Sequence, residues 1–175
     1  MRHNPGLWVV RCVTSLVSKC ILKEKIWCFK KIRVGLVTGC VTHTQNLVST
    51  AWVIYSPTNE LICSGGIFLG PTTNNVVEYC VVIGLMTEAM SNGISHMTIH
   101  LDSQLVMSQL NQNYSICNPM LLRLFRRVHL LERSFEFIQY YYIPRRFNMV
   151  VDSFSNYILD SYMSHLWTIS LNCTY

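Results

Sequence analysis

Three acidic residues stand out in a chain of 175 residues that contains only nine Asp and Glu in all. Glu78 lies in the string TNNVVEY, Asp102 in LDSQLVMSQL, and Asp152 in NMVVDSFSNYILD. Carboxylate oxygens are the ligands that hard divalent cations such as Mg²⁺ prefer. The three acids therefore indicate a divalent-metal site, provided that the fold brings them together.

The apolar patterns around these acids predict the elements that carry them. Three strands, at 32–38, 50–56 and 60–69, form an antiparallel meander. A helix follows, with Glu78 a turn inside it and off the buried stripe. A strand at 96–101 runs into Asp102, helices follow at 103–110 and from Pro119, a strand covers 136–143, and Asp152 opens a last helix. Acids at these points can gather at one edge of a sheet.

The stretch from about residue 32 to residue 160 resembles the ribonuclease H domain of plant retroelements and its cellular relatives. The strings that carry the resemblance are YSPTNEL, TNNVVEY, SNGISHMTIHLDSQLV, NPMLLRLFRRVHLLERSFEFI and YIPRRFNMVVDSFSN. It implies an α/β, ribonuclease H-like fold, a five-stranded mixed sheet with helices on both faces. It also implies cleavage of the RNA strand of RNA–DNA hybrids by four carboxylates with Mg²⁺ or Mn²⁺.

Three of the four carboxylates match residue by residue: Glu78, Asp102 and Asp152. The family places the fourth, an Asp usually followed by Gly, at the end of its first strand. The equivalent stretch here is IRVGLVTGCV, where the candidate positions are Thr38 and Cys40, and no acid occurs between Glu24 and Glu60. Neither a Thr hydroxyl nor a Cys sulfur replaces a carboxylate that bridges two hard cations. The sequence therefore predicts a nucleic-acid-binding domain of the RNA–DNA hybrid class whose nuclease activity is lost or reduced.

Two alternatives stay open. In the first, Glu78, Asp102 and Asp152 retain at least one ion, and the chain is an active metal-dependent ribonuclease of RNA–DNA hybrids. In the second, the chain is a domesticated retroelement fragment that acts as a protein-interaction module. Individually, each acid also has a structural interpretation, because acids complement the dipole of a helix start or cap a helix.

Several polar side chains are candidates for contact with the nucleic acid. One group of arginines lies on a helix face opposite its apolar stripe, a second pair lies in the loop before Asp152, and two asparagines precede the Glu78 helix. The alternatives are a solvated helix face for the first group and helix capping for the asparagines. The resemblance implies phosphate contacts for the arginines and contacts with the sugar edge for the asparagines. The residues are Arg123, Arg126, Arg127, Arg145, Arg146, Asn74 and Asn75.

Composition and charge divide the chain. Half of the residues are hydrophobic and 13% are charged, which suits one folded domain rather than a disordered chain. Residues 1–33 hold eight Lys and Arg against one acid, a net charge of +7, whereas residues 34–175 hold six against eight, a net charge of −2. Any binding of nucleic acid by residues 34–175 must therefore come from local clusters of basic side chains.

The ends of the chain lie outside the resemblance. Residues 1–31 form a basic extension, interpreted either as an organelle-targeting segment, for instance to the mitochondrion, or as a remnant of flanking sequence that makes a solvated helix. Otherwise we expect the nucleus or the cytoplasm. No apolar run is long enough for a membrane span. Residues 161–175 form an unmatched tail, and the sequence determines neither the oligomeric state nor a protein partner.

Overall fold

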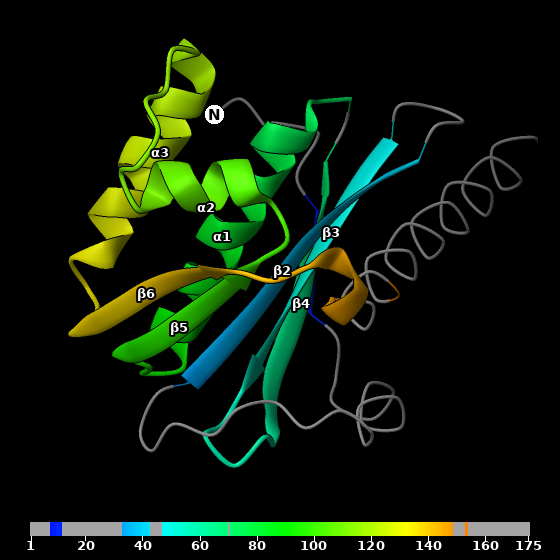
Figure 1. Cartoon of the computed structure of the whole chain (residues 1–175). Helices are drawn as coiled ribbons and strands as arrows, with labels where there is room; N and C mark the ends of the chain where they lie inside the picture. The colour runs from blue at the N-terminus through cyan, green and yellow to red at the C-terminus, as the bar shows by residue number, and fades with distance from the viewer. Residues whose placement is uncertain (1–7, 12–32, 43–46, 70, 149–152, 154–175) are drawn as a thin grey trace, which may run out of the picture.

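The computed structural model describes residues 8–11, 33–42, 47–69, 71–148 and 153. Six strands form one mixed sheet in the order β1-β4-β3-β2-β5-β6 (Figure 1). Their bounds are β1 Trp8–Arg11, β2 Arg33–Thr42, β3 Leu47–Tyr55, β4 Leu61–Leu69, β5 His96–Leu101 and β6 Phe137–Tyr142. The α/β ribonuclease H-like fold class expected from the sequence is confirmed.

The sheet has an antiparallel half and a parallel half. Strand β3 pairs antiparallel with both β2 and β4, as the predicted meander requires, whereas β5 pairs parallel with both β2 and β6. The turn between β3 and β4 covers Pro57–Asn59, where Asn59 takes a φ of 63° and its amide donates to the Ser56 carbonyl over 3.0 Å. Asparagine tolerates this left-handed conformation better than most residues do, so the predicted turn has the residue that it needs.

A sixth strand was not expected. Strand β1 pairs antiparallel with the outer edge of β4, and it comes from the segment that the sequence assigned to a basic extension. At residues 8–11 the backbone is therefore a strand and not the solvated helix of one interpretation. The composition Trp-Val-Val favours an extended conformation, but nothing in so short a string indicates which edge it pairs with.

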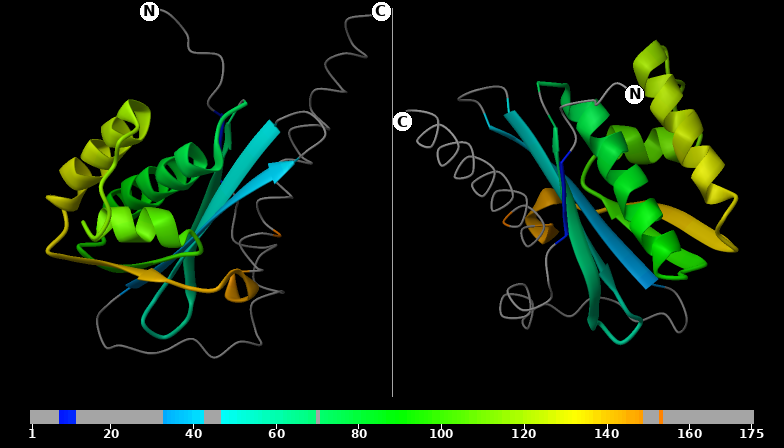
Figure 2. Two further views of the ribbon diagram at one scale, coloured as in Figure 1. Left: turned by 45° about the horizontal axis from the view of Figure 1, so that its top comes forward. Right: turned by 180° about the vertical axis from the view of Figure 1, so that it is seen from behind.

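Helices α1 (Asn74–Ser91), α2 (Gln104–Leu110) and α3 (Pro119–Glu132) lie on one side of the sheet (Figure 2). A short 3-10 helix, η2 (Arg145–Phe147), follows β6. The helix predicted to start at Asp152, which would cover the second face, lies outside the described residues apart from Ser153, which is helical. No helix among the described residues is long and apolar enough to cross a membrane.

Local signals explain where the helices begin and end. The Ser103 hydroxyl accepts from the Val106 amide at the start of α2, and Asn118 Oδ1 accepts from the amides of Met120 and Leu121 at the start of α3. Side-chain oxygens at this position satisfy amides that have no partner inside the helix. Gly93, with a φ of +67°, follows α1 and serves as the predicted helix stop.

Trp52 joins α1 to the sheet at the centre of the core. Its ring lies over Gly65 of β4 and against Gly84 of α1, where an added Cβ would come within 2.5 Å and 2.8 Å of ring carbons. Trp52 is 2% exposed. The two glycines are therefore required by the close approach of the indole, and they set the distance between α1 and the sheet.

Candidate functional site

Glu78 is buried, although the sequence placed it off the buried stripe of its helix. Its exposure is 8%, and its neighbours Val77 and Tyr79 are fully buried. That prediction is wrong because α1 is enclosed on more than one side, packing against β2, β3 and β4 and also against α3. Buried and apolar residues therefore occur on almost every side of α1. The hydrophobic periodicity of its sequence then cannot show which positions are exposed.

Asp102 is the first residue after β5, as predicted, and is half-buried. Strand β2 runs parallel to β5, and their last aligned pair is Val37 with Leu101. The residues that follow this pair are Thr38, inside β2, and Asp102, directly after β5, so their backbones lie side by side. Cys40 lies two residues further along β2 and pairs with Ser49 of β3.

Asp152, the third predicted ligand, lies outside the described residues, so its position relative to Glu78 and Asp102 stays a prediction. Among the residues that the structure describes, no three His, Cys, Asp or Glu side chains form a group that could hold a metal ion. Glu78 and Asp102 offer carboxylate oxygens, which suit Mg²⁺ or Mn²⁺. The donor chemistry fits a divalent ion, and Thr38 contributes no carboxylate beside Asp102.

The predicted nucleic-acid-binding arginines are all exposed. Arg123, Arg126 and Arg127 lie along α3, whose residues Leu121 and Val128 face the core. Burial raises the pKa of the Cys80 thiol of α1, and the nearby Arg127 guanidinium opposes that rise, which places this arginine near the boundary of α1 and α3. The α3 arginines thus form a cationic face, and their contact with phosphate stays a prediction.

Arg145 and Arg146 lie on η2, directly beyond β6, and both are exposed. The Arg146 guanidinium carbon lies 4.9 Å from the ring centre of Phe147, a distance typical of a cation–π contact. Phe147 is itself 52% exposed. A cation and an aromatic ring are therefore presented together next to the end of the sheet.

Asn74 and Asn75 are the first two residues of α1, and neither is the helix cap. Thr73 occupies the N-cap position and makes no side-chain capping hydrogen bond. The capping interpretation of the two asparagines is therefore wrong. Asn74 is exposed and Asn75 is half-buried, and their predicted contact with a sugar edge is untested.

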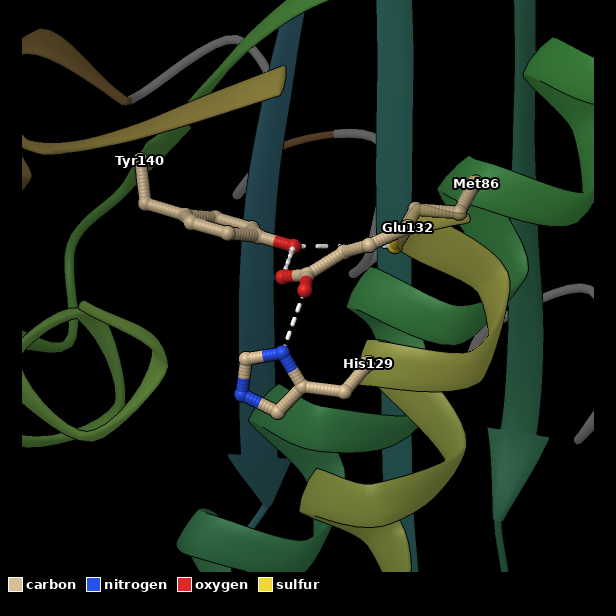
Figure 3. Close-up of polar contacts among 4 residues, drawn as sticks. All are labelled: Met86, His129, Glu132 and Tyr140. Atoms are coloured by element: carbon tan, nitrogen blue, oxygen red, sulfur yellow. Dashed lines mark hydrogen bonds and ion pairs between the residues drawn. The ribbon is translucent and has the colours of Figure 1, made fainter. Parts of the chain in front are cut away.

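A half-buried polar cluster that the sequence did not indicate joins α3 to β6 (Figure 3). Tyr140 donates from its hydroxyl to Glu132 Oε1 over 2.7 Å, and His129 Nδ1 pairs with the other carboxylate oxygen. Burial raises the pKa of Tyr140 strongly, and the hydrogen bond to Glu132 raises it further. The spacing of His129 and Glu132 on one helix face was visible in the sequence, but the partner on β6 was not.

A second hydrogen bond of this kind joins α1 to α2, where the Tyr79 hydroxyl donates to Gln109 Oε1 over 3.0 Å. Burial raises the pKa of Tyr79. Both tyrosines stay protonated at neutral pH and act as fixed donors that hold the helices in place. We assign them a structural role.

A surface hollow of about 460 Å³ lies between the α2–α3 connection and α3, and neither Glu78 nor Asp102 lines it. Its lining consists of neutral amides, hydroxyls and apolar groups together with one imidazole: Gln109, Gln112, Asn113, Tyr114, Ser115, Ile116, Leu122, Phe125 and His129. It contains no carboxylate. The candidate positions Thr38, Glu78 and Asp102 lie on β2, on α1 and directly after β5, and none of them lines this hollow.

The family model described as "Reverse transcriptase-like" matches residues 36–158, within the predicted domain of residues 32–160. The chain is similar to "Ribonuclease HI" of Halobacterium salinarum, with 30% identity over 112 residues, 64% of this chain and 56% of that protein. It is also 31% identical over 93 residues to "Bifunctional protein Rv2228c" of Mycobacterium tuberculosis, 53% of this chain and 26% of that protein. The chain thus spans about a quarter to about half of the length of these relatives.

Among solved structures, the crystal structure of RNase H1 from Halobacterium salinarum superposes with a TM-score of 0.70 at 27% identity, covering 74% of this chain and 98% of that one. The N-terminal RNase H domain of Rv2228c also gives a TM-score of 0.70, at 24% identity, over 77% of this chain and 97% of that one. From the family match over most of its length and these structural neighbours, the chain belongs to the reverse transcriptase-like family and forms a ribonuclease H-like domain.

Proposed function

We propose that this domain binds nucleic acid of the RNA–DNA hybrid class and that its nuclease activity is lost or strongly reduced. The observation that supports this proposal most directly is the register of β2 with β5, which places Thr38 beside Asp102. The family resemblance implies an Asp at the position of Thr38. No other acid is available to this strand, because none occurs between Glu24 and Glu60.

The loss follows from what a carboxylate does at such a place. Divalent ions, when bound at such a place, would stabilise the negative charge that develops on the oxygens of a phosphoryl transfer. A carboxylate carries a negative charge and two oxygens, so it can contact both ions. The Thr38 hydroxyl is neutral and has one oxygen, so this chain keeps Glu78 and Asp102 as anionic ligands but lacks the group that holds a pair of ions.

Retained binding is supported by the exposed arginines. Guanidinium groups match phosphate oxygens in charge and geometry. The five arginines predicted to contact phosphate lie in two separate places, on α3 and on η2. Similar proteins carry the names Ribonuclease HI and RNase H1, which are names of enzymes that act on nucleic acid. This similarity favours the same class of ligand for this chain. The finer assignment, to the plant retroelement type, rests on the sequence strings and is part of the proposal.

An active hybrid ribonuclease is the second candidate. The observation in its favour is that Glu78 and Asp102 both remain on the elements that the family resemblance implies, one buried on α1 and one after β5. Either acid can hold a divalent ion at reduced affinity. The two candidates differ in one measurable property, the rate of hybrid cleavage by the native chain.

The test is cleavage of a labelled RNA–DNA hybrid with Mg²⁺ and then with Mn²⁺, comparing the native chain with Thr38→Asp and Cys40→Asp. We expect the native chain to be silent or slow and Thr38→Asp to gain at least about tenfold, equivalent to about 1.4 kcal/mol of transition-state stabilisation. Cys40→Asp is the matched control on the same strand and should gain nothing. Fast cleavage by the native chain that Glu78→Gln abolishes would overturn the proposal in favour of the active enzyme.

Binding is measured separately, by anisotropy of the same hybrid in EDTA at two salt concentrations. Replacing Arg126 and Arg127 by Gln should weaken binding and reduce its salt dependence, since each phosphate contact releases counterions. A chain that neither binds nor cleaves the hybrid, in native or Thr38→Asp form, would contradict the proposal and favour a protein-interaction module.

A further inference from the structure

The outer face of β5 and β6 carries an ordered pair of rings that the proposed cleavage site does not use. Tyr140 faces the core and bonds to α3, and successive side chains of a strand point to opposite faces. Tyr141 therefore faces away from α1, α2 and α3. Its ring stacks on His100 of β5, with ring centres 5.8 Å apart and planes 27° from parallel, and the two residues are aligned neighbours in the parallel register.

Tyr141 remains accessible on its other side. Strand β6 is the last strand of the sheet, so no strand among the described residues lies beyond it. The side chain is 48% exposed. Its hydroxyl donates to Gln139 Oε1 on the same strand over 2.8 Å, which helps to fix the ring upright. One ring face is thus covered by His100, and the ring keeps open surface toward the edge of the sheet.

The composition of the following segment gives this face its charge. Residues 137–148, FIQYYYIPRRFN, contain two arginines and no acid. Arg145 lies four residues beyond Tyr141, a distance of at most about 14 Å even for a fully extended chain. Tyr141, Tyr142 and Phe147 account for three of the eight large hydrophobic side chains that are exposed in the described part of the chain.

An open aromatic ring next to exposed arginines suits one ligand chemistry in particular. Nucleobases stack on aromatic side chains whatever their identity, while cations neutralise the phosphates between them. A duplex offers no free base faces along its length, whereas an unpaired strand does.

We propose that the Tyr141–His100 stack, together with Arg145 and Arg146, is a platform for a single-stranded segment of nucleic acid that continues from the hybrid. The inference rests on the proposed function, because the platform and Asp102 lie at the same end of the β5–β6 pair. Leu101, the last residue of β5, is aligned with Tyr142, and Asp102 follows Leu101 directly. A base would stack on Tyr141 and extend the stack by one ring.

The experiment uses the full chain and three fluorescent probes: a blunt RNA–DNA hybrid, a single-stranded RNA of about eight nucleotides, and the DNA of the same sequence. Anisotropy gives the Kd for the native chain, for Tyr141→Ala and for Tyr141→Phe. The matched control is Tyr114→Ala, since Tyr114 is 60% exposed but lies on the α2–α3 connection. Thermal unfolding of each variant verifies that it is folded.

We expect Tyr141→Ala to weaken single-strand binding by about five- to tenfold, the loss of one stacked base, and to leave the Kd for the blunt hybrid unchanged. Tyr141→Phe keeps the ring and should bind as the native chain does, and Tyr114→Ala should have no effect. Comparing the RNA with the DNA shows whether the sugar contributes to recognition.

The platform is overturned if no single strand binds, which would leave this face available to a protein partner, or if Tyr141→Ala and Tyr114→Ala lose the same affinity. Failure of the proposed function gives a different pattern, in which the blunt hybrid does not bind while the single strand still binds and still depends on Tyr141. That pattern would support the platform by itself.

Discussion

The antiparallel and parallel halves of the sheet use their two faces differently. In β3, side chains on both faces are buried: Trp52 and Ile54 on the α1 face, and Val53 and Tyr55 on the other, are all at most 5% exposed. In β6, Tyr140 is buried at 7% while its neighbour Tyr141 is 48% exposed. The central strand β3 of the antiparallel half is therefore buried on both faces, whereas the edge strand β6 of the parallel half keeps surface that a ligand can reach.

The largest expected loss of stability comes from a substitution in the antiparallel half of the sheet. Trp52→Ala should lower the free energy of unfolding by about 3–5 kcal/mol, because it removes the ring that fills the space left by Gly65 and Gly84. Tyr141→Ala is the comparison from the parallel half and should change it by less than about 1 kcal/mol. Urea denaturation of both variants measures the difference, and equal losses would break the contrast between the two halves.

A smaller effect separates the two faces of β6. Tyr140→Phe removes the donor to the Glu132 carboxylate and should destabilise the protein by about 1–3 kcal/mol, because the carboxylate stays in place without that hydrogen bond. Tyr141→Phe removes an exposed hydrogen bond to Gln139 and should cost less than about 0.5 kcal/mol. The two neighbouring substitutions are chemically identical, so a similar loss for both would show that burial does not distinguish the faces.

The last effect appears at alkaline pH and concerns Tyr55 of β3. Burial raises the pKa of Tyr55 from 10.0 to about 12. Because the raised pKa favours the neutral form in the folded state, the stability that neutral Tyr55 contributes is complete below pH 10 and is lost as the pH rises through about 12. Tyr55→Phe should reduce the slope of stability against pH in this window, measured by denaturation between pH 9 and 12. An unchanged slope would contradict the assignment to Tyr55.

Local patterns in the sequence predicted most of the fold. Apolar patterns predicted β3 and β4, Gly93 predicted the end of α1, Pro119 predicted the start of α3, and Asp102 was expected after β5. These features depend on residues that are close in sequence. They did not predict β1, because the partner edge of Trp8–Arg11 is chosen by the assembled sheet.

The sequence predicted which residue types form the candidate site better than it predicted their burial and their neighbours. The absence of acids from IRVGLVTGCV is visible in the sequence, but which of Thr38 and Cys40 lies beside Asp102 depends on the register of β2 with β5, which connects residues more than sixty positions apart. Glu78 was expected off the buried stripe of α1 and is 8% exposed. The Tyr140–Glu132 bond and the Tyr141–His100 stack likewise join elements whose pairing is set only in three dimensions.

One measurement tests the central claim most directly: the rate of cleavage of an RNA–DNA hybrid in Mg²⁺ by the native chain, by Thr38→Asp, and by the double variant Thr38→Asp with Glu78→Gln. The account predicts little or no cleavage by the native chain, a gain of at least about tenfold for Thr38→Asp, and the loss of that gain in the double variant. Native cleavage that Thr38→Asp does not increase, and that Glu78→Gln abolishes, would contradict it.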